Sequence, residues 1–121
     1  MYKLLKINAI AIVVLGCIHL AATPFIMKGV NPEMRSVFLS MFTIAGMGTF
    51  LPGVAILNQL QNLKAGNKQS RNLIVFCIVY FLILALIAVS TMYTNPFAYI
   101  ALLLGLILLI PLPTLLKHQN K

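Results

Sequence analysis

Three long stretches of this chain contain no charged side chain and are predominantly apolar. They run from Ile7 to Met27, from Ser36 to Leu63 and from Asn72 to Leu116, over 21, 28 and 45 residues. A helix needs about 20 apolar residues to cross a hydrocarbon core about 30 Å thick, so the first two stretches each predict one transmembrane helix. The third is long enough for two. Apolar residues follow one another instead of alternating with polar ones, which favours helices over the strands of a membrane barrel.

The third stretch divides at the segment 93–96, which reads Tyr-Thr-Asn-Pro. These residues favour turns, and proline disfavours the α conformation in the residue before it. We therefore predict helices over residues 7–25, 36–58, 73–92 and 97–116. The expected fold is an all-α integral membrane protein, a four-transmembrane-helix bundle. It forms a single membrane domain over residues 1–121, because the connections are too short to hold another domain.

The basic residues predict how this bundle is oriented. With four spans, seven of them share the side of the two termini: Lys3, Lys6, Lys64, Lys68, Arg71, Lys117 and Lys121. The opposite side holds only Lys28 and Arg35, together with the acidic Glu33. Cytoplasmic loops carry an excess of Lys and Arg. We therefore expect both termini in the cytoplasm and a multi-pass protein of the cell membrane, the inner membrane of a bacterium.

The composition excludes a soluble domain, and it also bears on which partners the net positive charge predicts. Hydrophobic residues make up 61% of the chain and charged residues 8%, against roughly 45–50% and about 25% in soluble proteins. The formal charge of +8 does not predict nucleic-acid binding, because the basic residues lie at helix ends, where they meet lipid headgroups. The expected partners are the lipid bilayer and either further copies of this chain or a larger membrane complex. The N-terminal apolar segment resembles a signal peptide, but it lacks a small residue at the −3 position, so we expect it to be retained.

Most membrane chemistries lack the residues that they need. Coupled transport commonly uses a carboxylate inside the membrane, and the only acidic residue, Glu33, falls in a predicted loop. Cys17 and Cys77 differ in predicted depth by about 9 Å, which is too far for a disulfide. His19 and His118 also differ in depth, so they cannot hold a haem together. We predict no catalytic residue, no metal site and no cofactor.

Each predicted helix carries one face of small or weakly polar residues, as expected where helices pack in lipid. Along the chain these faces comprise Ala9, Gly16, His19 and Thr23, then Ala45, Thr49 and Gly53, then Cys77, Tyr80, Ala88 and Thr91, and finally Ala98, Ala101 and Gly105. Pro52 predicts a kink in the second helix, and Pro111 and Pro113 predict the end of the fourth.

The polar residues within the spans gather in the predicted outer half. The candidate ligand-binding residues are His19, Thr23, Ser40, Thr43, Ser90 and Thr91. One interpretation is a shared polar cavity. The other is that the hydroxyl groups are dispersed, each bonded to a carbonyl of its own helix. His19 is the candidate for proton exchange or ligand contact, because its imidazole titrates near physiological pH. The alternative is a structural histidine, hydrogen-bonded to the second or third helix.

Three functional hypotheses remain. The first is a non-catalytic module, meaning a subunit, an assembly factor or a binder of an apolar ligand, with a polar outer-leaflet region around His19. The second is an oligomeric channel or transporter for small solutes. The third is a membrane enzyme that acts on lipid or quinone, with His19 as its acid–base group.

The predicted orientation can be tested with a reporter fused after Lys121. We expect a reporter that works only in the cytoplasm to be active there, because seven basic residues share that side of the membrane. Activity of a periplasmic reporter at the same position would contradict the orientation and the assignment of the polar residues to the outer half.

Overall fold

The computed structural model describes residues 1–117, which form four long helices and one short helix. They are α1 (Tyr2–Met27), α2 (Arg35–Lys64), α3 (Lys68–Thr91), α4 (Pro96–Leu109) and α5 (Leu112–Lys117). The predicted all-α four-helix bundle is confirmed, and four segments are long and apolar enough to cross a membrane. Lys121, one of the seven basic residues that we expect on the side of the termini, lies outside the described residues.

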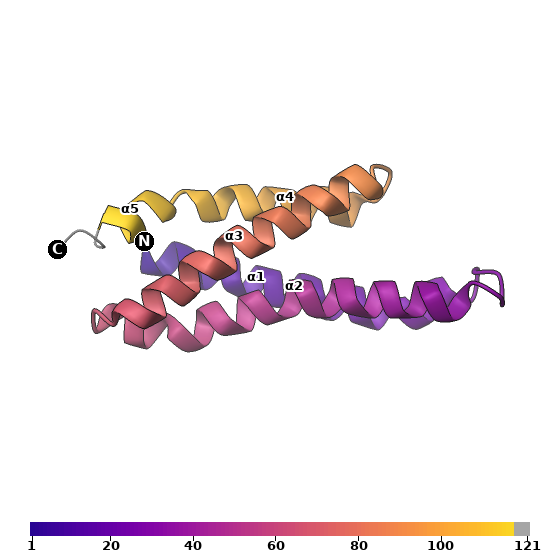
Figure 1. Ribbon diagram of the computed structural model, residues 1–121, viewed down its shortest axis with the longest axis horizontal. Coiled ribbons are helices and arrows are strands. Elements are labelled where there is room, and N and C mark those ends of the chain that lie inside the picture. The colour runs from indigo at the N-terminus through magenta and orange to yellow at the C-terminus, as the bar shows by residue number, and fades with distance from the viewer. Residues whose placement is uncertain (118–121) are drawn as a thin grey trace.

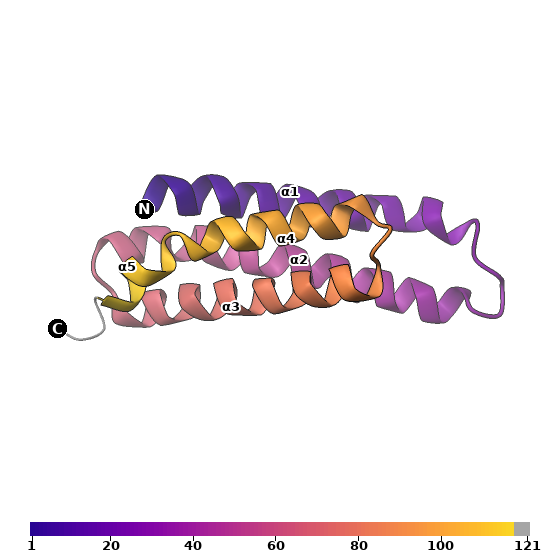
Figure 2. The ribbon, with the colours of Figure 1, turned by 90° about the horizontal axis from the view of Figure 1, so that it is seen from above.

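The bundle consists of two antiparallel hairpins, α1–α2 and α3–α4, with α5 following α4. Figures 1 and 2 show that α1 begins and α5 ends at the same end of the bundle, which we call the terminal end. Both views also show that the α1–α2 hairpin extends beyond the α3–α4 connection at the opposite end, which we call the distal end. The two hairpins are therefore unequal in length.

Three helices continue beyond the apolar stretches that predicted them. α1 begins at Tyr2 instead of residue 7, α2 continues to Lys64 instead of residue 58, and α3 begins at Lys68 instead of residue 73. The added turns are amphipathic, and the Lys64 ammonium lies 5.8 Å from the centre of the Tyr2 ring. A helix ends where its backbone is capped, which is not necessarily where its side chains become polar. At α3 the cap is Asn67, whose side chain accepts a hydrogen bond from the Ser70 backbone N–H.

The fourth predicted helix, over residues 97–116, corresponds to the candidate span Pro96–Lys117, which consists of α4 and α5. α4 ends at Leu109, and α5 resumes the helical conformation at Leu112, after the buried Pro111. Proline lacks the backbone N–H of the helix and clashes with the preceding turn, which accounts for the break. At its start, α4 has Pro96 in the first turn and Asn95 as its cap, an arrangement that favours helix initiation.

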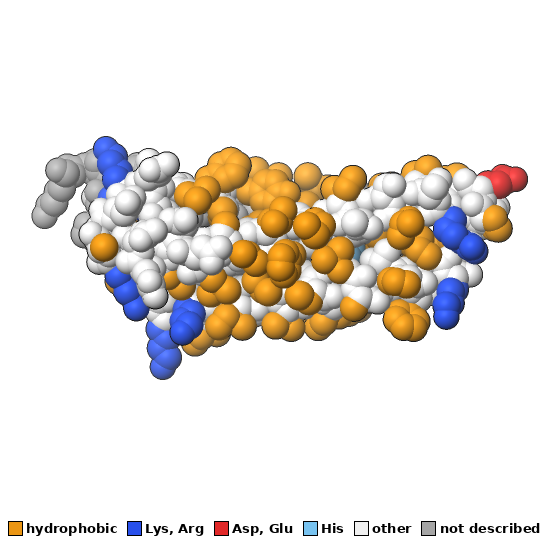
Figure 3. Space-filling view, turned by 90° about the horizontal axis from the view of Figure 1, so that it is seen from below, with side chains coloured by type: hydrophobic (Ala, Val, Ile, Leu, Met, Phe, Trp, Pro, Cys, Tyr) orange, Lys and Arg blue, Asp and Glu red, His pale blue; other side chains and the backbone are white. Residues whose placement is uncertain are grey.

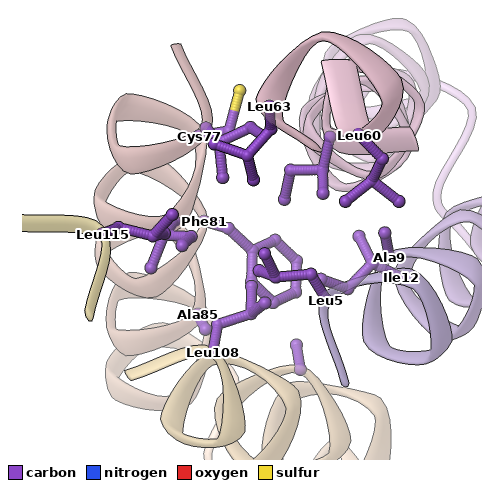
Figure 4. Packing of buried hydrophobic residues seen from close by; sticks show 14 of the residues in the cluster. Leu5, Ala9, Ile12, Leu60, Leu63, Cys77, Phe81, Ala85, Leu108 and Leu115 are labelled. Atoms are coloured by element: carbon purple, nitrogen blue, oxygen red, sulfur yellow. The ribbon is translucent and has the colours of Figure 1, made fainter. Parts of the chain in front are cut away.

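The hydrophobic core lies toward the terminal end, where all four long helices meet. Figure 4 shows Phe81 of α3 pointing into the middle of the bundle, toward Leu5 of α1. The largest fully buried side chains are Phe81, Leu5, Ile12, Ile56, Ile74, Ile78, Leu108 and Leu115. This packing closes the interior of the bundle on the terminal side.

Small residues set the closest helix contacts, as the sequence predicts for most of the chain. Gly16 and Gly53 are buried between α1 and α2, and Ala98, Ala101 and Gly105 of α4 are all buried. A Cβ atom at Gly16 would lie 2.8 Å from the backbone of Phe50, closer than Cβ atoms approach a backbone. The prediction was wrong for Tyr80 on α3, which is exposed.

The outer surface of the bundle suits a lipid bilayer. Large apolar side chains are exposed on every long helix, including Phe25, Ile44, Phe76 and Leu103. Figure 3 shows hydrophobic side chains across the middle of the molecule and Lys and Arg side chains gathered at its two ends. This is the arrangement expected of a multi-pass membrane protein.

The contact between α1 and α2 can be tested at Gly16. We expect Gly16→Ala to destabilise the bundle by about 1–3 kcal/mol, because the added methyl group must push the two helices apart. Gly29→Ala is the matched control, since its new Cβ would meet only the Ile26 carbonyl oxygen at 3.8 Å. Thermal unfolding in detergent, followed by circular dichroism, measures both. Equal melting temperatures would contradict the close packing at Gly16.

Candidate functional site

A cavity of about 450 Å³ lies between the two hairpins in the distal half of the bundle. All four long helices contribute to its wall, which is mostly apolar. Five alanines line it, namely Ala45 of α2, Ala85 and Ala88 of α3, and Ala98 and Ala101 of α4. Because a methyl group is the smallest side chain with a Cβ atom, these positions leave space that larger side chains would fill. We call this space the hairpin cavity.

The cavity follows from the course of α3. Near the α2–α3 connection, α3 lies against α2, where the Ser70 hydroxyl donates to the Gln59 side-chain oxygen at 2.7 Å. Figure 1 shows that α3 then crosses the bundle obliquely and reaches α4 at the far end. The two hairpins therefore separate toward the distal end, and the side chains on the facing walls, five alanines among them, leave the gap unfilled.

His19 lies on the α1 wall of the hairpin cavity. It is half-buried, and its ring stacks on Phe42 of α2, with 5.4 Å between centroids and 19° between planes. A Cβ atom at Gly46 would lie 2.5 Å from the Leu20 side chain and 3.2 Å from the His19 ring, so this glycine provides space for both side chains beside α2.

The expected hydrogen bond from His19 to a hydroxyl of α2 or α3 is not formed at Nε2. That nitrogen is buried and has no hydrogen-bond partner within the part of the chain that the structure describes. An unpaired buried polar atom costs about 1–3 kcal/mol relative to the same atom in water. The stack on Phe42 therefore orients His19, while part of its hydrogen-bonding capacity stays unused.

Among the other candidates, Thr91 also lines the hairpin cavity. Its hydroxyl donates to the Ile87 carbonyl oxygen at 2.8 Å, one turn earlier on the same helix. The structure thus brings His19 and Thr91 to one cavity, from α1 and α3. Thr23 is buried close to His19 but lies outside the wall, and its hydroxyl donates to the His19 carbonyl oxygen at 2.9 Å.

The remaining candidates are not brought into the cavity. Ser40 and Ser90 are exposed, and their hydroxyls donate to the carbonyl oxygens of Ser36 and Ile87 on their own helices, at 3.0 and 2.8 Å. Thr43 is exposed as well. Bonding within the helix satisfies these hydroxyls without a partner from elsewhere, which is the dispersed arrangement considered from the sequence.

Two polar residues outside the candidate list also line the hairpin cavity: Thr49, which the sequence placed on a packing face, and Asn95, which it placed in a turn. Sequence reasoning missed a third polar residue of the interior. Asn8, only 3% exposed, lies in the terminal half, where its side-chain amide donates to the Leu104 carbonyl oxygen at 3.1 Å. The sequence feature that could have identified Asn8 is its position as a single amide side chain at the start of the first apolar stretch. The expected helix began at residue 7, so Asn8 fell in its first turn, whereas α1 begins more than a turn earlier, at Tyr2.

Other reactive side chains lie apart from the hairpin cavity. Cys17 is exposed and Cys77 is buried, and both thiols are free. Glu33 is exposed in the connection between α1 and α2. Within residues 1–117, no three side chains of the His, Cys, Asp or Glu type gather where they could hold a metal ion. The hairpin cavity is thus an apolar chamber with a few polar atoms on its wall.

Comparisons of this chain with models of protein families, with curated proteins and with solved structures found no match. The functional argument therefore depends on the geometry of the molecule.

The role of His19 in stability can be tested with His19→Leu. We expect the free energy of unfolding to change by less than about 1 kcal/mol, because the substitution removes an unpaired buried nitrogen together with the stack on Phe42. Since the chain contains no tryptophan, circular dichroism in detergent is the suitable measurement. His19→Gln serves as the polar control. A large fall in melting temperature for His19→Leu alone would show that the ring forms an essential structural bond.

Proposed function

We propose that this chain is a non-catalytic membrane module that binds an apolar ligand in the hairpin cavity. The observation that carries the proposal is the cavity itself, a space of about 450 Å³ with a mostly apolar wall. Cavities that bind small molecules typically measure about 300–1,000 Å³ and combine apolar walls with a few polar groups. Five alanines contribute only methyl groups to this wall, which leaves room for a ligand beside the larger apolar side chains.

The polar atoms of the wall favour a ligand with one polar group. Thr91 and Asn95 lie close to the α3–α4 connection, and His19 lies across the cavity on α1. The Asn95 side-chain oxygen accepts from the Phe97 backbone N–H at 3.0 Å, while its NH2 group makes only a long contact, 3.9 Å to the sulfur of Met92, and retains capacity for a stronger bond. An elongated apolar molecule with a hydroxyl or carbonyl group at one end would satisfy this arrangement.

The same proposal includes an orientation in the membrane. We place the terminal end in the cytoplasm and the hairpin cavity in the outer half of a bacterial inner membrane. The support is the distribution of Lys and Arg, of which only Lys28 and Arg35 adjoin the α1–α2 connection. An excess of basic residues marks the cytoplasmic side.

The interior of the bundle favours binding over transport. Between the hairpin cavity and the terminal end, Leu5, Phe81 and Leu108 are fully buried and pack together. A transport path for a polar solute would have to cross this layer. The acid–base role considered for His19 is also less favoured, since Glu33, the only acidic side chain of the chain, is exposed in a loop and is not placed to orient the imidazole.

The proposal can be tested by filling the hairpin cavity from α3. We expect the protein purified from membranes in a mild detergent to retain a small apolar molecule, detected as an added mass by native mass spectrometry. Ala88→Phe should abolish this retention, because Ala88 lines the cavity and the new ring would occupy it. Ile83→Phe is the matched control, since Ile83 lies on the same helix but faces outward.

Two results would contradict apolar-ligand binding. One is a wild-type protein that carries no added mass in any mild detergent. The other is equal retention by Ala88→Phe and Ile83→Phe, which would place the retained molecule on the outer surface. Circular dichroism of each variant confirms that the helices are intact.

A further inference from the structure

A second cavity, of about 280 Å³, lies at the terminal end of the bundle. It forms where the start of α1, the α2–α3 connection and α5 meet, and its wall includes Tyr2, Leu63, Lys64, Arg71 and Leu115. We call it the basic pocket. It lies at the opposite end of the molecule from the hairpin cavity and shares no lining residue with it.

Two cationic side chains share this small space. Arg71 is only 9% exposed, which is unusual for a guanidinium group, while Lys64 is held over the Tyr2 ring. No acidic side chain lines the pocket, and the only one in the chain, Glu33, lies in the connection at the distal end. Arg71 has an interaction of its own, so the inference rests on the net positive charge of the wall.

The local backbone brings the two cations together. α2 ends with Lys64, and Gly66 then adopts a φ of +81°, a left-handed conformation that favours glycine. The Gly66 N–H donates to the Leu63 carbonyl oxygen, and the Asn67 N–H donates to the Asn62 carbonyl oxygen, both at 3.0 Å. This tight reversal starts α3 immediately, so Lys64 and Arg71 line the same pocket from two helices.

We propose that the basic pocket binds a phosphate-bearing anion, such as the headgroup of an anionic phospholipid. The positive charge of the wall attracts the negative charge of a phosphate group, and no acidic side chain opposes it. The pocket lies at the end of the apolar spans, at the level where lipid headgroups meet the protein. Basic pockets between transmembrane helices are suited to such headgroups. Leu63 and Leu115 supply apolar wall for the part of the lipid nearest the phosphate.

The inference can be tested by titrating the purified protein with defined lipids. The probes are phosphatidylglycerol and phosphatidylcholine with identical acyl chains, added in detergent and measured by native mass spectrometry. We expect phosphatidylglycerol to bind at least several-fold more tightly, because phosphatidylcholine carries no net charge. Equal binding of the two lipids would overturn the proposal.

Two variants distinguish binding in the basic pocket from attraction to the general positive charge of the terminal end. Lys64→Gln should weaken phosphatidylglycerol binding about fivefold. Lys68→Gln removes the same charge four residues away, outside the pocket wall, and should have a much smaller effect. Equal losses in the two variants would show diffuse attraction to the surface and overturn the site.

A final comparison identifies the source of the phosphate. If inorganic phosphate at constant ionic strength raises the melting temperature of the wild type but not of Lys64→Gln, the pocket binds free phosphate as well. If it raises neither, the lipid is the source. The Ala88→Phe variant should keep its preference for phosphatidylglycerol, so this site and the hairpin cavity can fail or succeed independently.

Discussion

The close contact between α1 and α2 holds the molecule together. Helices in lipid gain little from burying apolar surface against each other, so their association depends on fitted contacts between small residues. Gly16 meets the backbone of Phe50, and a Cβ atom at Gly53 would lie 2.8 Å from the Ala9 carbonyl oxygen. These two points bring the first hairpin to a separation that no larger residue permits. The second hairpin then packs on this pair through the hydrophobic core, in which Leu108 lies near the terminal end and Phe81 near the middle of α3.

The hairpin cavity is a consequence of packing the second hairpin at one end only. Fully buried side chains such as Leu5 and Leu108 fix α3 and α4 near the termini, and α3 then diverges from α2. Alanines on the diverging faces leave the gap open. The hydroxyls of the distal half do not draw the hairpins together, because Ser40, Ser90 and Thr91 each bond to their own helix. The terminal end of the bundle thus contains the stabilising core, and the distal end contains the open cavity.

The sequence predicted the number of spans and the buried face of α4, because apolar length and the spacing of small residues determine both. It did not predict the helix ends, which depend on caps such as Asn67 and on turns that continue beyond the apolar stretch. Of the candidate site residues, the structure brings His19 and Thr91 to the hairpin cavity, and the sequence could not separate them from Ser40 and Thr43. That separation depends on helix rotation and on the oblique course of α3. Asn8 was missed because its depth depends on where α1 begins.

The unequal lengths of the two hairpins have a consequence for the surrounding bilayer. α2 has 30 residues and α3 has 24, which correspond to about 45 Å and about 36 Å of helix. Part of this difference is polar, because α2 ends in Asn, Gln and Lys residues, but the α1–α2 hairpin still extends further at the distal end. A bilayer matched to the shorter hairpin would accommodate the longer one by tilting it or by thickening the leaflet around it. Beside the shorter hairpin, the leaflet would be thinner. The boundary between the two regions falls along the seam where the hairpins separate, so the acyl chains there pack against an uneven wall.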